Sequence, residues 1–178
     1  MTLHERYTKE IRPALAKELG VKNLLAAPRV TSVTVAVGLS HGLKDPKFID
    51  AAESVLSRIT GQKPVRTKAK QAVSNFKIRK GMVIGMRVTL RGKRMWSFLD
   101  KLVHVTFPRI RDFRGISSKQ LDTQGNITIG FREFLPFPEI RPDEVERVHG
   151  LEVTMTTTSG NKKNGRALSA ALGFPFKD

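Results

Sequence analysis

The chain has 178 residues, no cysteine and a formal net charge of +16, from 32 basic and 16 acidic residues. The lack of cysteine excludes disulfides, thiolate zinc sites and cysteine nucleophiles, and no run of apolar residues is long enough to suggest a membrane span. This length predicts one domain, and so large a positive charge indicates a polyanionic partner such as nucleic acid.

The first predicted element is a helix over residues 2–19. Thr2 and Glu5 have the spacing of a capping box, and Pro13 predicts a kink near residue 12. Apolar residues recur every four positions, at Leu3, Tyr7, Ile11, Leu15 and Leu19. The first ten residues contain no apolar signal core, so we expect the protein in the cytoplasm, or in the stroma or matrix of an organelle.

A strand over residues 30–37 and a helix over residues 46–60 follow, the helix capped by Asp45 and ended by Gly61. Between them, residues 38–42 read GLSHG, which matches the G-x-S-x-G pattern of serine hydrolases. In that pattern the helix starts directly after the serine, whereas here it starts several residues later. An esterase that uses Ser40 is therefore a minor alternative.

Residues 60–94 contain eleven Lys and Arg and no Asp or Glu. A solvated surface usually mixes both signs, so this run indicates a bound polyanion. We expect a short strand over residues 65–68, a long, partly mobile loop over residues 69–81 with a strand-like piece at residues 76–78, and a strand from Gly81 to Leu90. In the last strand, Arg87 and Thr89 alternate with apolar residues that face the core.

Helices, strands and loops are predicted for the rest of the chain. We expect a helix over residues 93–106, irregular basic chain over 108–115, a loop over 116–126 and a strand over 127–131. We also expect an exposed or docking loop over residues 134–138 and an acidic patch over residues 139–146. A strand over 151–158, a flexible basic turn over 160–165, a helix over 166–172 and a C-terminal segment that folds back onto the core complete the chain.

Several long motifs together resemble one family. They are PRVTSVTVAVG, GQKPVRTKAK, SNFKIRKGMVIGMRVTLRGKRMW, FPRIRDFRGIS, GNITIGFRE, FPEI and GRALSAALGFPF. In this order they resemble the bacterial and organellar form of ribosomal protein L5, the large-subunit family that binds 5S ribosomal RNA, over nearly the whole chain. Two departures are Ala36, where the family usually has asparagine, and the basic linker over residues 159–165.

The resemblance implies an α+β fold, an antiparallel sheet with helices on one face and the other face open for RNA. It also implies binding to 5S and 23S ribosomal RNA at the central protuberance, beside other large-subunit proteins. The residues expected to hold 5S RNA are Arg29, Gln62, Lys63, Arg66, Thr67, Lys68, Lys70, Arg87, Thr89, Arg91 and Arg94.

The resemblance further implies that one loop contacts transfer RNA in the peptidyl site and that later loops meet a small-subunit protein in an intersubunit bridge. The loop residues are Ser74, Asn75, Phe76, Lys77, Ile78, Arg79, Lys80 and Met82. The bridge residues are Arg111, Asp112, Phe113, Arg114, Glu139, Asp143, Glu144 and Glu146. A basic small-subunit partner would complement the acids among them.

The favoured function is therefore a structural RNA-binding protein with no catalysis, cofactor, metal, membrane partner or small-molecule substrate. A free-standing nucleic-acid chaperone or architectural protein is the main alternative, because charge alone does not identify the RNA that is bound.

Overall fold

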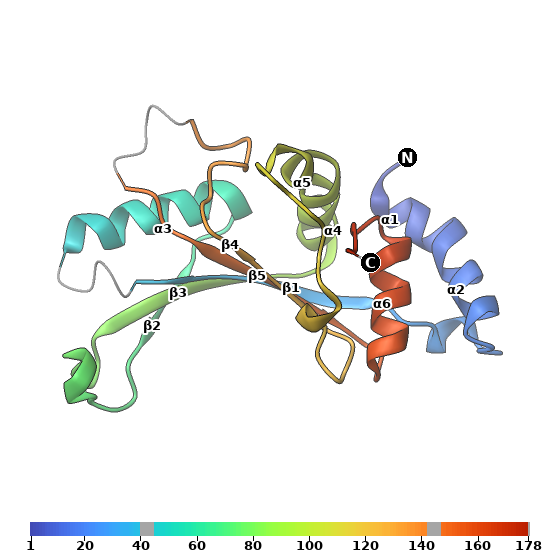
Figure 1. Cartoon of the computed structure of the whole chain (residues 1–178), viewed down its shortest axis with the longest axis horizontal. Coiled ribbons are helices and arrows are strands. Elements are labelled where there is room, and N and C mark those ends of the chain that lie inside the picture. Colours follow the sequence, from blue (N-terminus) through green and yellow to red (C-terminus); the bar gives the residue numbers. More distant parts are fainter. Residues whose placement is uncertain (40–44, 142–146, 178) are drawn as a thin grey trace. The chain divides into compact units, whose positions relative to one another are not determined.

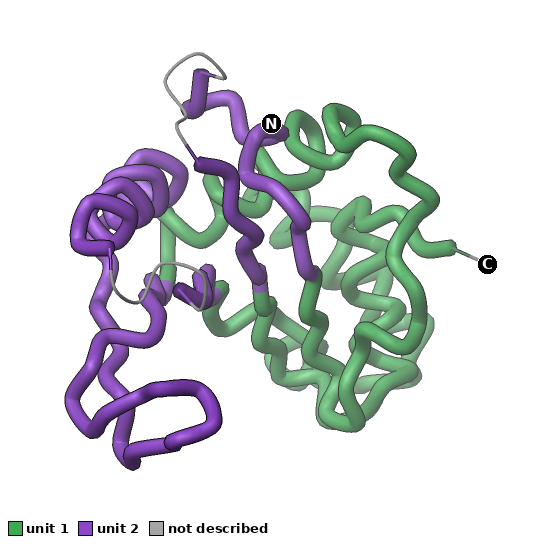
Figure 2. Tube along the Cα trace, turned by 60° about the vertical axis from the view of Figure 1, so that its left-hand side comes forward, with its two compact units in different colours: residues 1–33, 90–129, 154–178 green, residues 34–89, 130–153 purple. Residues whose placement is uncertain are grey.

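A computed structural model describes residues 1–39, 45–141 and 147–177 (Figure 1). The chain divides into two compact units, coloured in Figure 2. Unit 1 contains residues 1–33, 90–129 and 154–178, and unit 2 contains residues 34–89 and 130–153. The chain thus passes between the units four times, and each passage lies within or at the end of a strand.

One five-stranded antiparallel sheet has the order β2-β3-β1-β5-β4. Its strands are β1 (Val30–Gly38), β2 (Val65–Lys68), β3 (Val83–Leu90), β4 (Ile127–Phe131) and β5 (Leu151–Thr157). The predicted α+β class is confirmed, and each strand lies within two residues of its predicted bounds. Side chains that alternate between buried and exposed explain this agreement. In β3, Met86, Val88 and Leu90 are buried while Arg87 is exposed.

In unit 2, helix α3 (Pro46–Thr60) has the predicted bounds. The Asp45 side chain accepts hydrogen bonds from the backbone N–H groups of Lys47 and Phe48, and Gly61 ends the helix in the left-handed conformation at φ 65°. The apolar stripe of α3 is buried, with Leu56 fully enclosed. The GLSHG motif falls mostly on residues 40–42, which lie outside the described residues.

In unit 1, the N-terminal helix consists of α1 (Leu3–Arg6), the π-helical turn η1 (Tyr7–Ile11) and α2 (Arg12–Glu18). The capping box of Thr2 and Glu5 is present. The predicted irregularity near Pro13 takes the form of this wider turn, and the proline lies in the first turn of α2. The short helix η2 (Leu24–Ala26) then leads to β1.

The predicted helix over residues 93–106 is longer in the structure. It comprises α4 (Gly92–Lys101), the π-helical turn η4 (Leu102–Thr106) and α5 (Phe107–Arg109), followed by the short helix η5 (Ser118–Gln120). Pro108 does not stop this helix, because it lies in the first turn of α5, where a missing N–H costs little.

Helix α6 (Lys162–Ala171) corrects a second prediction, since it occupies most of the expected flexible turn. Asn161 caps the helix through a 2.8 Å bond from the backbone N–H of Asn164. Gly165 lies inside α6, where the backbone of Gly125 would be 2.4 Å from an added Cβ. Only glycine fits at this position of the helix, because the backbone of Gly125 packs against it. The local sequence does not show this contact.

The prediction of an exposed loop at residues 134–138 is wrong, and the docking alternative is right. Phe134 and Phe137 are 1% and 0% exposed. The chain end folds back as predicted, because Phe174 is buried and the N–H of Ile116 donates to the carbonyl of Pro175 at 2.7 Å.

Candidate nucleic-acid interface

The register of β2 with β3 decides which basic residues share a face. Val65 pairs with Arg87 and Thr67 with Gly85, so these four residues point to one side of the strand pair. Arg87 is exposed, and Val65 is 63% exposed although it is apolar. This face is therefore open in unit 2, and it carries a cation beside a hydroxyl group.

Gly85 brings β3 close to its neighbour on this face. A Cβ atom at this position would lie 2.9 Å from the carbonyl oxygen of Val37 in β1 and 3.1 Å from the hydroxyl of Thr67. No side chain larger than hydrogen fits without movement of the backbone. The flat patch that results leaves Thr67 and Arg87 accessible to a broad ligand.

Arg66 lies on the other side of the strand pair, because it pairs with the buried Met86. Its guanidinium donates to the carboxylates of Glu53 and Asp50 on α3, at 2.6 and 2.7 Å. These hydrogen bonds raise the pKa of Arg66 above its ordinary value. The structure thus separates Arg66 from Arg87, and both partners of Arg66 come from the helix that covers that face.

The expected loop over residues 69–81 continues the hairpin of β2 and β3. Ala69 donates to the carbonyl of Met82 at 2.8 Å, and Val73 and Ile78 exchange hydrogen bonds of 2.9 and 3.1 Å. The expected strand-like piece is wrong for Phe76, which belongs to the short helix η3 (Ser74–Phe76). Lys77, at φ 54°, closes this turn through its N–H bond to Ser74.

The hairpin end presents cations and one aromatic ring to solvent. Phe76 is 72% exposed, an unusual state for a large apolar side chain. Ile78 and Met82 are half-buried, and the Met82 sulfur accepts from the N–H of Arg79 at 3.1 Å. The other predicted contact residues of the hairpin are all exposed: Lys68, Lys70, Ser74, Asn75, Lys77, Arg79 and Lys80.

Other predicted RNA contacts lie on short loops and strand ends. Lys63 is exposed, while the side-chain amide of Gln62 donates to the carbonyl of Thr89 at 3.3 Å. In unit 1, Arg29 is exposed, and its backbone carbonyl accepts from the N–H of Thr158.

Arg91 and Arg94 mark the start of α4 in unit 1, and both are exposed. Arg91 is the N-cap residue and makes no side-chain capping bond, and the first turn contains no acid. A helix N-terminus carries a partial positive charge from its unpaired N–H groups. The arginines add to this potential, as does the exposed Lys93, which the sequence analysis omitted.

The RNA contacts predicted from the sequence do not include the hydroxyl groups of the sheet in unit 1. The Thr31 hydroxyl donates to the carbonyl of Thr156 at 3.0 Å, and the hydroxyls of Thr128 and Thr154 lie 3.1 Å apart. These threonines are half-buried. In LEVTMTTT (residues 151–158), threonines alternate with apolar residues. This alternation would have placed Thr154 and Thr156 together on one face of the sheet.

The predicted bridge residues fall in both units. In unit 1, Arg111, Asp112 and Arg114 are exposed, whereas Phe113 stacks on Phe107 with ring centroids 5.3 Å apart and planes 7° apart. This stacking anchors the loop. In unit 2, Glu139 is half-buried. The other acids, Asp143, Glu144 and Glu146, lie outside the described residues.

The described residues also bear on metal sites and membrane spans. Within residues 1–39, 45–141 and 147–177, no three His, Cys, Asp or Glu side chains gather in a way that suits a metal ion. In the same ranges, no helix combines the length and apolarity needed to cross a membrane.

The fold and this surface define a basic α+β protein with an exposed cationic strand pair and hairpin, the kind of surface that suits a polyanion. The sequence matches the model of ribosomal protein L5 over residues 23–79 and the model of that family's C-terminus over residues 83–176. The chain belongs to the ribosomal protein L5 family.

Relatives support this assignment along the whole chain. The large ribosomal subunit protein uL5 of Bdellovibrio bacteriovorus is 49% identical over 175 residues, which are 98% of each chain. The protein of the same name from Anaeromyxobacter sp. (strain Fw109-5) is 50% identical over 98% of this chain and 97% of its own. Members of the family are structural components rather than enzymes, so the esterase alternative is rejected.

Proposed function

We propose that this protein is a structural component of the large ribosomal subunit that binds 5S ribosomal RNA through the open face of its β2–β3 strand pair. The observation that carries this proposal is the register that puts Thr67 and Arg87 together on the face opposite to α3. The cation contacts phosphate, and the hydroxyl suits ribose and base edges.

Further cations extend this interface. Lys63 before β2, Lys68 at its end and Lys70 after it are exposed, and Gln62 and Thr89 add neutral polar groups. In unit 1, Arg29, Arg91 and Arg94 are exposed, the last two at a helix start whose N–H groups favour an anion. We assign these residues to ribosomal RNA, 5S or the adjoining 23S. Arg66 is the exception, because its guanidinium is held by α3, and we assign it to positioning β2.

The hairpin end is proposed to contact transfer RNA in the peptidyl site. Its exposed ring at Phe76 offers a stacking surface, and the exposed Lys77, Arg79 and Lys80 follow it closely in the chain. Two backbone hydrogen bonds between Val73 and Ile78 support the base of the turn.

The loops at residues 111–114 and 139–146 are proposed to meet a basic small-subunit protein across the subunit interface. This proposal rests on the resemblance and on the acids of the second loop, which complement a basic surface. Neighbouring large-subunit proteins complete the surroundings. The protein acts in the ribosome, in the bacterial cytoplasm or in the stroma or matrix of an organelle.

The proposal is tested by competition between 5S RNA and an unrelated structured RNA of equal length. We expect 5S RNA to displace the unrelated RNA at low excess and not the reverse. With about six ionic contacts, log affinity falls against log salt concentration with a slope of roughly −4 to −5. Equal competition by both RNAs would instead support a nucleic-acid chaperone.

A further inference from the structure

The start of α6 in unit 1 carries two exposed lysines, Lys162 and Lys163, that the proposed RNA contacts do not include. Within the described residues, neither member of this lysine pair meets a carboxylate. Arg166, one turn further on, is not part of the pair. Its guanidinium lies 5.7 Å from the Phe176 ring, close in sequence to Asp178, which lies outside the described residues.

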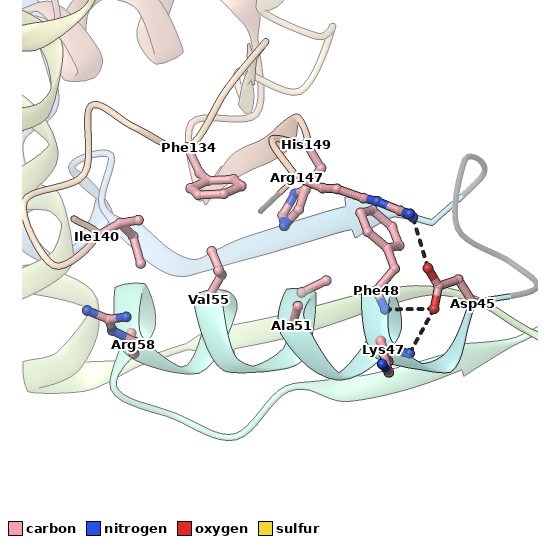
Figure 3. A pocket seen from close by; sticks show the side chains of 11 residues that line it. Asp45, Lys47, Phe48, Ala51, Val55, Arg58, Phe134, Ile140, Arg147 and His149 are labelled. Carbon is pink, nitrogen blue, oxygen red and sulfur yellow. Dashed lines mark hydrogen bonds and ion pairs between the residues drawn. The ribbon is translucent and has the colours of Figure 1, made fainter. Parts of the chain in front are cut away.

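Helix α3 in unit 2 also has an exposed lysine in its first turn, Lys47, but in different surroundings. The carboxylate of Asp45 caps α3 and accepts a further 2.9 Å hydrogen bond from Arg147 (Figure 3). In α6 the cap is the uncharged Asn161, and the first turn contains no acid. Since its own turn supplies no carboxylate, the lysine pair suits an anion from outside the chain.

Hydrogen bonds hold the chain before α6 in place. The hydroxyl of Thr157 donates to the carbonyl of Gly125 at 2.9 Å, and its N–H donates to the side-chain oxygen of Asn126 at 2.8 Å. The side-chain amide of Asn164 donates back to the carbonyl of Ser159 at 3.3 Å. The backbone that carries the lysine pair is therefore tied to the end of the sheet.

The same end of the sheet carries a residue of the proposed RNA interface. The N–H of the exposed Arg29 donates to the hydroxyl of Thr158 at 3.1 Å, and the N–H of Thr158 donates to the carbonyl of Arg29 at 2.9 Å. Lys162 comes four positions after Thr158, so their Cα atoms are at most about 14 Å apart. The acid of the turn beside α6, Asp122, accepts hydrogen bonds from two N–H groups of its own turn, at 2.9 and 2.8 Å.

We propose that the lysine pair contacts the phosphate backbone of ribosomal RNA and extends the RNA interface from Arg29 onto α6. This inference rests on the proposed function, because it takes ribosomal RNA as the partner. A lysine meets phosphate as a point charge and does not read base edges in a fixed geometry, so the pair adds affinity without sequence preference. The phosphates belong to 5S RNA or to the adjoining 23S RNA, and two measurements distinguish these sources.

The first measurement is binding of 5S RNA at four salt concentrations. Replacing both lysines by glutamine should make the slope of log affinity against log salt less negative by about 1.4 to 1.8, because two phosphate contacts are lost. The second measurement is release from reconstituted large subunits by rising salt. An unchanged slope with release at lower salt than the parent chain assigns the contact to 23S RNA, and no change in either measurement overturns the proposal.

A matched pair of variants separates contact from general charge. Lys163→Glu and Lys47→Glu make the same change of charge in the first turn of two helices. In the measurement that responds to the glutamine variant, Lys163→Glu should weaken binding roughly tenfold or more, and Lys47→Glu less than about threefold. Equal effects of the two variants would refute a contact at α6.

Stability gives an independent control. An acid in the first turn favours a helix, so the urea midpoint of Lys163→Glu should equal or exceed that of the parent chain while RNA binding falls. A lower midpoint would instead assign a structural role to Lys163. If the parent chain shows no preference for 5S RNA over the unrelated RNA, the proposed function fails, whereas a parent that prefers 5S RNA and is insensitive to the lysine pair refutes only this inference.

Discussion

At the scale of single residues, position on the sheet gives different surroundings to two arginines that look equivalent in the sequence. Arg66 and Arg87 both lie in the acid-free run, yet they point to opposite faces of the β2–β3 pair. Both side chains are exposed, but only Arg66 is shown in ion pairs, with Asp50 and Glu53. An exposed arginine can release counterions from RNA, whereas one that carboxylates already neutralise contributes little to that release.

The first prediction compares these two arginines. Arg87→Ala should weaken 5S RNA binding more than tenfold at fixed salt and make the salt slope less negative by about 1, because one phosphate contact is lost. Arg66→Ala should leave the slope unchanged and lower the free energy of unfolding, because two carboxylates lose their partner. Binding titrations at four salt concentrations and urea unfolding measure both effects. An unchanged dissociation constant in Arg87→Ala would remove this residue from the interface.

His149 provides a prediction on pH. Burial lowers the pKa of its imidazole below the ordinary value near 6.5. In the interval between the folded and unfolded pKa values, the unfolded chain binds the proton and the folded chain does not. The stability is therefore complete above pH 6.5 and falls as the pH drops through that interval. Urea unfolding between pH 5 and 7.5 should show a smaller loss in His149→Phe, and identical pH profiles for both chains would refute the assignment.

At the scale of elements, the hairpin beyond β2 is a hydrogen-bonded extension of the strand pair. Pairing through Ala69, Val73 and Ile78 carries the basic turn away from the strands that hold the proposed 5S RNA contacts. Base and tip can thus have different partners, because the tip needs the base for support but the base does not need the tip.

The prediction at this scale removes only the tip of the hairpin. Replacing Ser74–Lys77 by Asn-Gly, a favoured two-residue turn, leaves the pairing of Val73 with Ile78 in place. The variant should bind 5S RNA with the affinity of the parent chain and should impair translation when it replaces that chain in ribosomes. Loss of 5S RNA binding by a folded variant would show that the tip of the hairpin also takes part in 5S RNA binding.

At the scale of the whole molecule, the two units are not separate stretches of sequence. Unit 1 is made of three segments and unit 2 of two, and β1, β4 and β5 each contribute residues to both. Neither unit has a continuous chain of its own, so a simple cut between them would break strands.

This connectivity predicts one cooperative unfolding transition for the full chain. Urea curves followed by far-ultraviolet circular dichroism should coincide with curves followed by the fluorescence of Trp96, which lies in unit 1. A tryptophan placed in unit 2 at the exposed Ser54 should report the same midpoint. Two midpoints would show that the units unfold independently.

Much of the fold could be predicted from local patterns. Alternating residues identified the strands, and the Asp45 and Gly61 signals fixed both ends of α3. The exceptions depend on distant partners: Gly165 lies in a helix that packs against Gly125, and burial of Phe134 and Phe137 decided between the exposed and the docking form of the predicted loop. Such contacts join residues far apart in the chain. Neither secondary-structure propensity nor the periodicity of apolar residues reveals them.

The sequence by itself determined the class of partner and the family, because net charge, the acid-free run from residue 54 to 99 and the long motifs are properties of composition and order. Only the tertiary structure decided the direction of each cation, since pairing register assigns a strand residue to one face or the other. That register turned Arg66 toward α3 and left Arg87 exposed. Folding also enclosed His149 between Phe48 and Phe134, residues separated in sequence that form a cavity only when α3 meets the chain after β4.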